Sequence, residues 1–340
     1  MKNILITGGA GYIGSHTAVE LLEAGYGVVI ADNLSNADTT CLEGVKKITG
    51  RDIPFYHADC CRKDQLLPIF GEHRIDGVIH FAAFKAVGES VEKPLMYYHN
   101  NVLSLVTLLE VLAENKGGHV VFSSSATVYG QPPVLPVTED TPRMPATSPY
   151  GNTKQICEDI LTDTVKANAS IKGIILRYFN PIGAHPSALI GELPRGIPNN
   201  LVPFITQTAA GIRKELQIFG NDYNTPDGTA LRDYIDVVDL AAAHVSALKR
   251  MEAQNKPGLC EVFNVGTGKP LSVMELVKRF QTINNVSLKY RITGRREGDV
   301  EAVWADTSLA NRVLSWKAKR PLEDTLANAW AWEKRIRGIK

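Results

Sequence analysis

A tyrosine and a lysine stand four residues apart in the stretch "SPYGNTK", residues 148–154, just after a proline that cannot extend a helix backwards. Positions four apart share one face of a helix, so Tyr150 and Lys154 can act on one bound molecule. A tyrosine hydroxyl, with an ordinary pKa of about 10, is a poor base at neutral pH. A lysine ammonium about 5 Å away would favour the phenolate by roughly 3 kcal/mol. The pair therefore predicts proton transfer by Tyr150.

Three serines close the strand-like segment "GHVVFSSS", which precedes the tyrosine in the chain. Open α/β sheets bind their ligands at the carboxyl ends of the strands. Ser125, the last of the three, can bridge a substrate hydroxyl to Tyr150, although serines at a strand end also serve as turn formers. We therefore predict a catalytic group of Ser125, Tyr150 and Lys154.

The segment "TGGAGYIGSH" follows the first apolar run directly and places Gly8, Gly11 and Gly14 at G-x-x-G-x-x-G spacing. Because glycine has no Cβ, the first two let backbone N–H groups approach a pyrophosphate at a helix N-terminus, and Gly14 lets the helix pack closely. Asp32 closes the second run in "VVIADN". Its carboxylate can accept both hydroxyls of an adenosine ribose and would repel a 2′-phosphate. These residues predict bound NAD rather than NADP.

The elements that position these residues show as short apolar runs alternating with amphipathic segments of helical length. In order they are "NILIT", 11–24, "GVVIAD", 37–48, "IPFYHAD", 61–70, "IDGVIHFAA", 95–115, "GHVVFSSS", 149–168 and "KGIILRY". Strand, helix and strand at this spacing predict parallel crossovers, and nearly continuous apolar runs are typical of strands covered on both faces. We expect an α/β fold, a Rossmann doubly wound parallel sheet.

The sequence changes character after about residue 180, where "FNPIGAHPSALIGELPRGIPNN" supplies turns rather than regular elements. A helix is expected at about 236–253, a strand at "EVFNVG", and two or three short helices from about 271, one of them capped by Ser272 with Glu275 three residues later. The sequence shows neither repeats nor a low-complexity linker. We therefore expect a smaller C-terminal substrate domain interwoven with the first domain.

Composition restricts the kind of partner and compartment. With 340 residues, 44% hydrophobic and 21% charged, the chain can bury a full core, and a net charge of +1 gives no reason to expect nucleic acid or a membrane surface. The opening apolar run breaks into glycines rather than a cleavage site, so we expect a cytoplasmic protein. Five cysteines without a C-x-x-C pair predict reduced thiols, and histidines without a cluster predict that no metal is bound.

The motifs "TGGAGYIG", "SSSATVYG" and "SPYGNTK" together closely resemble the extended short-chain dehydrogenase/reductase family. The segments "HFAAFKAVGES", "LRYFNPIGAHPS", "GIPNNL", "LRDYI" and "RREGD" resemble the members of that family that invert C4 of UDP-hexoses. The match runs over essentially the whole chain. It implies interconversion of UDP-glucose and UDP-galactose through a 4-keto intermediate, tightly held NAD, and a homodimer formed through the helices near 95–115 and 149–168.

The resemblance also assigns roles to residues by matching motif. Ser125 and Tyr150 would be catalytic, while Lys154 would tune Tyr150 and hold the nicotinamide ribose. The residues implied to contact NAD are Gly8, Gly11, Tyr12, Ile13, Gly14, Asp32, Asn33, Asp59, Cys60, Phe81, Ala82, Lys85, Asn100, Tyr150, Lys154 and Tyr178. Those implied to contact the UDP-sugar are Lys85, Ser125, Tyr150, Phe179, Asn180, Asn200, Leu201, Arg232, Tyr234, Arg296, Asp299 and Val303. The two arginines, Arg232 and Arg296, can supply charge-assisted bonds to a diphosphate.

The same resemblance sets the expected domain boundaries. The NAD-binding domain would comprise residues 1–180 and about 234–265, and the UDP-sugar-binding domain residues 181–233 and 266–340.

One position departs from the family pattern, and three other functions compete with epimerisation. Val303 stands where bacterial members restricted to the plain hexose carry a tyrosine, so a larger pocket would admit UDP-GlcNAc and UDP-GalNAc, unless neighbouring side chains refill the space.

A 4,6-dehydratase needs an acid pair after the catalytic hydroxyl, and here Ala126 and Thr127 follow Ser125. A dehydrogenase that releases its cofactor and a dinucleotide-binding sensor without activity would share the same fold and cofactor site.

Overall fold

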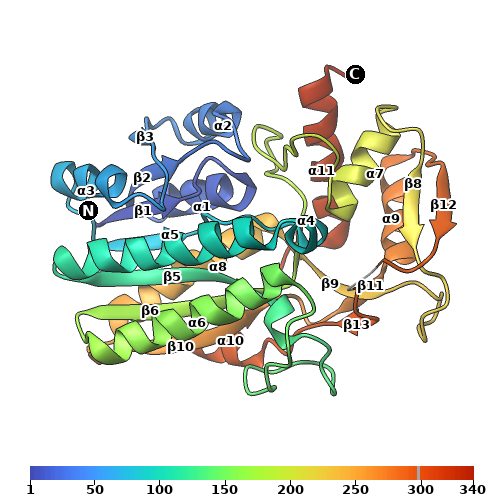
Figure 1. Cartoon of the computed structure of the whole chain (residues 1–340). Coiled ribbons are helices and arrows are strands. Elements are labelled where there is room, and N and C mark those ends of the chain that lie inside the picture. The colour runs from blue at the N-terminus through green and yellow to red at the C-terminus, as the bar shows by residue number, and fades with distance from the viewer. Residues whose placement is uncertain (297–298) are drawn as a thin grey trace.

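A parallel sheet of seven strands forms the centre of the molecule in this computed structural model, which describes residues 1–296 and 299–340 (Figure 1). Its strands are β1 Asn3–Thr7, β2 Gly27–Asp32, β3 Phe55–His57, β4 Gly77–His80, β5 Gly118–Ser125, β6 Ile171–Tyr178 and β10 Cys260–Val265. They lie in the order β10-β6-β5-β4-β1-β2-β3, and all six pairings are parallel. The predicted Rossmann fold is confirmed.

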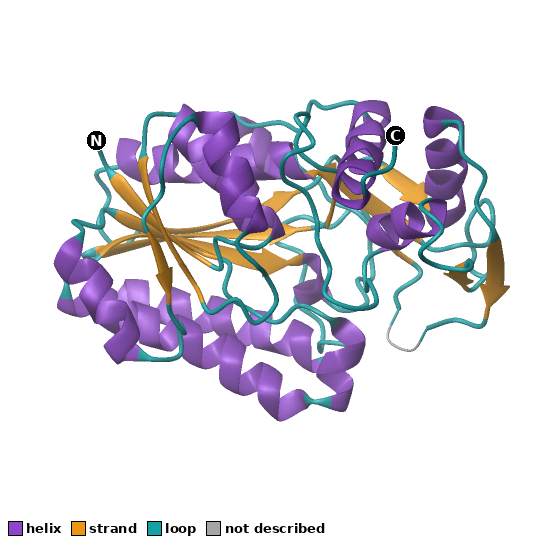
Figure 2. Ribbon diagram, turned by 90° about the horizontal axis from the view of Figure 1, so that it is seen from above, coloured by secondary structure: helices purple, strands orange, loops and turns teal. Residues whose placement is uncertain are grey.

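Helices cover both faces of this sheet (Figure 2). The helices α1 Tyr12–Glu23, α2 Thr40–Thr49 and α8 Val237–Ala253 pack on one face, and α3 Lys63–Glu72, α5 Pro94–Glu114 and α6 Pro149–Ala167 on the other. Successive side chains of a strand point to opposite faces, so Ile4 and Ile6 join the core under α1 and α8 while Leu5 joins the core under α5 and α6. Each such fully buried side chain stabilises the fold by about 1.5–3 kcal/mol.

The expected elements of the large sheet and of the helices that cover it agree closely with the structure. The helices expected at 11–24, 95–115 and 149–168 are α1, α5 and α6, whose ends differ from the prediction by one residue at most. The helix expected at 236–253 is α8, and "EVFNVG" forms most of β10. Local hydrophobic periodicity is enough to predict these elements, because each is long and has an apolar side that faces the sheet.

The second half contains more regular structure than its composition predicts. Four short strands form a mixed sheet and two others pair separately: β7 Asn180–Ile182, β9 Leu231–Asp236, β11 Pro270–Ser272 and β13 Ala302–Val303, then β8 Leu216–Phe219 with β12 Tyr290–Thr293. The helices of this part are α7 Leu201–Ala209, α9 Val273–Asn284 and α11 Leu322–Arg337, which lie on the right of Figure 1 with β8 and β12. The segment 179–200, predicted to be rich in turns, holds only the short strand β7, whereas α7, β8, β9, β11, β12 and β13 were not predicted.

The remaining short elements lie between these larger ones. They are α4 Val87–Glu92, the 3-10 turn η1 Ala126–Tyr129 and α10 Ser308–Val313. The predicted cap of α9 is confirmed, because the Ser272 hydroxyl oxygen accepts a hydrogen bond from the backbone N–H of Glu275 at 2.9 Å. Within the ranges that the structure describes, no helix has the length and apolar character needed to cross a membrane.

Candidate active site

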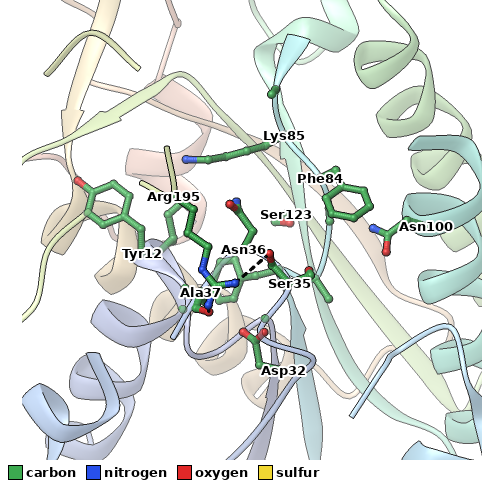
Figure 3. Close-up of a pocket in the computed structure, with 18 of the residues that line it drawn as sticks. Tyr12, Asp32, Ser35, Asn36, Ala37, Phe84, Lys85, Asn100, Ser123 and Arg195 are labelled. Atoms are coloured by element: carbon green, nitrogen blue, oxygen red, sulfur yellow. Dashed lines mark hydrogen bonds between the residues drawn. The ribbon is translucent and has the colours of Figure 1, made fainter. Parts of the chain in front are cut away.

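The strand order reverses between β4 and β1, the point at which open α/β sheets form a crevice at the carboxyl ends of their strands. A cavity of about 1070 Å³ lies there (Figure 3). It is lined by every residue for which we expect a cofactor contact, from Gly8 in the first loop to Tyr178 at the end of β6. Segments from most of the first half of the chain therefore meet around one space.

The glycine loop fits a pyrophosphate closely. Gly8 has a φ of +73°, and a Cβ there would lie 2.8 Å from the backbone nitrogen of Ala82. A Cβ on Gly14 would lie 2.5 Å from the carbonyl oxygen of Gly8, so α1 packs against the loop at backbone distance. Helix α1 begins after Gly11 without a side-chain cap. Its first N–H groups therefore offer an anion site of the kind that holds dinucleotides.

Asp32 closes β2 beside this loop, as predicted. Its side chain is buried, and its two oxygens accept hydrogen bonds from the backbone N–H of Ala10 at 3.1 Å and of Leu34 at 2.9 Å. Burial raises the pKa of this carboxyl, and the two hydrogen bonds act in the opposite direction. The carboxylate is held at the cavity wall with lone pairs left for ribose hydroxyls. The loop and this acid together fit NAD.

Helix α6 presents the predicted catalytic pair. It begins at Pro149 because the Ser148 hydroxyl oxygen accepts a hydrogen bond from the backbone N–H of Gly151 at 3.2 Å, and proline is favoured at the first helical position. Tyr150 lies in the first turn and Lys154 one turn later, with Nζ 5.9 Å from the centroid of the Tyr150 ring. Both side chains line the cavity.

The electrostatics of the pair differ from the prediction. Burial raises the pKa of Tyr150, and a hydrogen bond with Ser125 lowers it in part. Burial lowers the pKa of Lys154 to about 8, so the charged ammonium form of Lys154 is itself disfavoured. The protein alone therefore does not give the phenol the lowered pKa expected from Lys154, because burial of the phenol is the larger effect. A further positive charge in the cavity would be needed to favour the phenolate.

Ser125 is the residue of the catalytic group that closes β5. Its hydroxyl oxygen accepts a hydrogen bond from the backbone N–H of Thr127 at 3.2 Å, which starts the turn η1. The serine thus forms the turn considered from the sequence, and it also lowers the pKa of the Tyr150 phenol in part. Its catalytic role stays a prediction.

The small mixed sheet brings together predicted substrate residues that are far apart in sequence. Asn180 on β7 lies opposite Tyr234 on β9, and Arg232 on β9 lies opposite Val303 on β13. The Asp299 carboxylate lies beside Arg232, with a nitrogen to oxygen distance of 3.7 Å. The sheet register therefore sets the spacing of this group.

Asp299 also joins the second predicted arginine to this group. Arg296 donates a 2.9 Å hydrogen bond to the same carboxylate oxygen of Asp299. One carboxylate thus orients the two guanidinium groups of Arg232 and Arg296. A pair of arginines held in this way can bind a diphosphate.

Glu192 connects two other predicted residues. Its carboxylate accepts a hydrogen bond from Lys85 Nζ at 2.9 Å and from the side-chain amide of Asn200 at 2.6 Å. Leu201 follows as the first residue of α7. Phe179 and Val303 lie in one buried apolar cluster close to the end of β5.

Two residues of this region were missed in the sequence. Phe219, at the end of β8, is 38% exposed, and the Arg296 guanidinium lies 5.7 Å from its ring centroid. Arg195 lines the cavity and contacts the loop after Asp32 (Figure 3). Neither follows a recognisable motif, because each acquires its position from a contact across many residues of the chain.

Known proteins resemble this chain along nearly its whole length. The family model described as GDP-mannose 4,6 dehydratase matches residues 5–329. The UDP-glucose 4-epimerase of Haemophilus influenzae is 51% identical over 331 residues, which is 97% of each chain. The chain belongs to the UDP-glucose 4-epimerase family. That family lies within the extended short-chain dehydrogenases/reductases, so the resemblance stated from the motifs is confirmed.

Solved structures of UDP-glucose 4-epimerases have the same fold. The enzyme of Bifidobacterium longum in complex with NAD+ and UDP has a TM-score of 0.95 and 45% identity, with 100% of both chains covered. The enzyme of Stenotrophomonas maltophila with bound NAD and formylated UDP-arabinopyranose has a TM-score of 0.96, also at 45% identity and full coverage of both chains. Membership of the UDP-glucose 4-epimerase family favours the epimerase over the dehydratase, the dehydrogenase and the inactive sensor.

Proposed function

We propose that this protein interconverts UDP-glucose and UDP-galactose with NAD held in the cavity. The observation that carries the proposal is the meeting of two groups in one space. Tyr150 and Lys154 line the same cavity as the glycine loop and Asp32, and Ser125 lowers the pKa of the Tyr150 phenol in part. A proton-transfer group beside a dinucleotide site is suited to oxidation and reduction of an alcohol carbon.

The protein's residues would move the proton. Tyr150, as phenolate, takes the proton of the sugar 4-hydroxyl, with Ser125 as hydrogen-bond partner of that hydroxyl. NAD, held by the glycine loop and Asp32, would supply a reversible hydride acceptor for C4 and a positive charge that favours the Tyr150 phenolate. Tyr150 then gives the proton back to the oxygen at C4. The product has inverted stereochemistry at C4, and nothing is consumed.

Inversion requires the nucleotide to be held while the hexose turns. Arg232 and Arg296, oriented by Asp299, are suited to the diphosphate. The exposed ring of Phe219 beside Arg296 offers a flat apolar surface to a base. The strongest contacts are therefore expected at the nucleotide, and the hexose stays free to turn either face of its ring towards the cofactor.

The test is an assay of purified protein without added cofactor. Mass and absorbance analysis determines whether NAD copurifies, and a coupled assay follows UDP-galactose to UDP-glucose. We expect turnover without external NAD. A need for stoichiometric NAD would indicate the dehydrogenase, a 4-keto-6-deoxy product would indicate the dehydratase, and absence of turnover with NAD bound would indicate the sensor.

A second activity, on UDP-GlcNAc and UDP-GalNAc, follows from Val303. This side chain packs with Phe179 in the cluster beside the end of β5, where a tyrosine would fill more space. We propose that the smaller residue leaves room for a 2-acetamido group. Turnover of UDP-GalNAc that is lost in Val303→Tyr, with UDP-galactose turnover kept, supports the idea. No turnover by the wild type at millimolar substrate ends it.

We propose a homodimer through α5 and α6, which pack side by side on one face of the sheet. The outer side of α5 carries exposed Leu95 and half-exposed Leu103 and Val106, and α6 adds half-exposed Ile156. Two such faces would form a four-helix contact. Analytical ultracentrifugation should give a dimer that dissociates in Val106→Glu, and a monomeric wild type at micromolar concentration contradicts the proposal.

We also propose the domain division and the compartment expected from the sequence. Residues 1–180 and about 234–265 would form the NAD-binding domain, with 181–233 and 266–340 holding the UDP-sugar. Strand β9 continues to Asp236 within the smaller sheet, so the boundary near 234 falls inside an element. All five cysteines are free thiols, which is consistent with a reducing compartment such as the cytoplasm.

A further inference from the structure

The segment of residues 189–200, here named the strap, connects β7 to α7 and runs along the cavity. Its first part is fixed to the rest of the fold. The Trp332 indole N–H donates to the carbonyl oxygen of Glu192 at 2.9 Å, and the Cys41 thiol contacts the carbonyl oxygen of Gly191 at 3.8 Å. A Cβ on Gly44 would lie 2.3 Å from the carbonyl oxygen of Leu189, so α2 and the strap touch at backbone distance.

The middle of the strap reaches across to the loop of residues 33–38, which follows Asp32. The Arg195 guanidinium donates to the carbonyl oxygen of Leu34 at 2.8 Å and of Ser35 at 3.3 Å, and also to that of Ala37. Figure 3 shows Arg195 against Ser35 and Ala37, on the side of the cavity that carries Asp32. One side chain thus joins two segments that are far apart in sequence.

The end of the strap belongs to the other half of the site. Asn200, expected to contact the UDP-sugar, donates to the Glu192 carboxylate at 2.6 Å, and Lys85 donates to the same oxygen at 2.9 Å. The strap therefore has one contact beside the expected adenosine position and another beside the expected UDP-sugar position. Because a single short segment carries both contacts, a displacement of the strap at Asn200 would also displace Arg195, and the reverse.

We propose that Arg195 is a latch that keeps the dinucleotide in the cavity, and that the strap couples UDP-sugar binding to cofactor retention. This inference rests on the proposed function, since it assumes NAD in the cavity and a UDP-sugar that contacts Asn200 at its margin. With Arg195 bonded to the 33–38 loop, the loop and strap form a closed rim that the dinucleotide must open to leave. A nucleotide that contacts Asn200 holds the strap in place and so slows that opening. By linkage, bound NAD strengthens UDP binding by the same factor.

The experiment measures exchange of bound NAD for radiolabelled NAD in the purified holoenzyme, by rapid filtration, with and without UDP. We expect Arg195→Ala to speed exchange about tenfold or more, since such a factor corresponds to roughly one charge-assisted hydrogen bond lost. Arg195→Lys should be intermediate, because an ammonium lacks the planar fork that reaches several carbonyls. UDP should slow exchange in the wild type and have little effect in Arg195→Ala.

The matched control is Arg74→Ala, which removes an exposed arginine that precedes the central strand β4 and does not line the cavity. Exchange by Arg195→Ala equal to that of Arg74→Ala overturns the latch, and equal slowing by UDP in both overturns the coupling. Epimerase activity is followed separately. If Arg195→Ala is active and exchanges NAD at the normal rate, the latch is rejected and the proposed reaction stands. If the protein lacks epimerase activity but Arg195→Ala exchanges NAD fast, the proposed reaction is rejected and the latch stands.

Discussion

Lys154 Nζ donates a 2.6 Å hydrogen bond to the carbonyl oxygen of Ser123, two residues before the end of β5. This bond ties the catalytic helix α6 to the strand that ends in Ser125. Because Tyr150 precedes Lys154 by one helical turn, the bond fixes how far the phenol lies from the serine. Lys154 is therefore a positioning residue as well as a charge beside the cofactor site.

The phenol is expected to be needed for chemistry and dispensable for nucleotide binding. Tyr150→Phe should lower kcat by about 10²–10⁴-fold, the usual contribution of a positioned acid or base. The affinity for UDP should stay within about twofold, because the nucleotide is assigned to Arg232 and Arg296. Steady-state assay and calorimetric titration with UDP measure the two quantities.

A matched control removes a hydroxyl from a nearby tyrosine outside the catalytic group. Tyr98 on α5 receives a 2.7 Å hydrogen bond from the side-chain amide of Asn152 on α6. Tyr98→Phe should keep nearly full turnover. Near-normal turnover by Tyr150→Phe would remove the phenol from the mechanism.

A buried ion pair holds the same helix one turn further on. Arg177 on β6 donates to the Glu158 carboxylate at 2.7 and 2.9 Å, and the Ser124 hydroxyl donates to it at 2.5 Å. Arg177→Met should destabilise the protein by about 3–5 kcal/mol, because it leaves the buried Glu158 carboxylate with only the more distant Arg143 guanidinium, 3.6 Å away. The urea midpoint of unfolding measures the loss.

The double variant decides whether the loss comes from the poorly compensated charge of Glu158. Glu158→Gln in the Arg177→Met background removes that charge and should recover a large part of the stability. If the double variant is less stable than Arg177→Met alone, the stabilising role belongs to packing rather than to the ion pair.

Gly14 and Gly71 offer a paired test of the close approach in the glycine loop. A Cβ on Gly14 would meet the backbone of Gly8 and Gly9 at 2.5 and 2.7 Å, whereas one on Gly71 in α3 would meet open space. Gly14→Ala should displace α1 from the loop and weaken NAD binding by at least about tenfold. Gly71→Ala should keep NAD affinity and add roughly 0.5–1 kcal/mol of stability.

NAD affinity of the two refolded proteins is measured by fluorescence titration, and stability by thermal unfolding. Equal NAD affinity for Gly14→Ala and Gly71→Ala would contradict the assignment of this loop to the pyrophosphate.

Whether a feature could be predicted from the sequence depends on how far apart in the chain its contacting residues are. Tyr150 and Lys154 are one helical turn apart, and the glycine loop follows its strand directly, so local pattern finds them. The pairing of Arg232 with Val303 joins residues far apart through a strand of two residues, too short for any periodicity. The contact of Arg195 with the 33–38 loop likewise exists only after the strap is placed, and no local signal marks it.

Three buried histidines are expected to make the fold sensitive to acid. His16, His80 and His244 are each fully enclosed, and burial lowers the pKa of each to about 3. In the unfolded chain their pKa is the ordinary 6.5. Between these values the unfolded state binds more protons than the native state, so stability is full above about pH 6.5 and falls as the pH decreases. Each histidine contributes a slope of about 1.4 kcal/mol per pH unit.

Substitution of one of the three isolates its share of this slope. His80 contacts the Thr7 hydroxyl through Nδ1 at 2.8 Å, and an amide can take that place in His80→Gln. Urea unfolding at pH 7, 6 and 5 should show a shallower loss of stability for the variant, by about 1.4 kcal/mol per pH unit. An unchanged slope would mean that His80 binds protons equally in the native and unfolded states, so that burial does not lower its pKa.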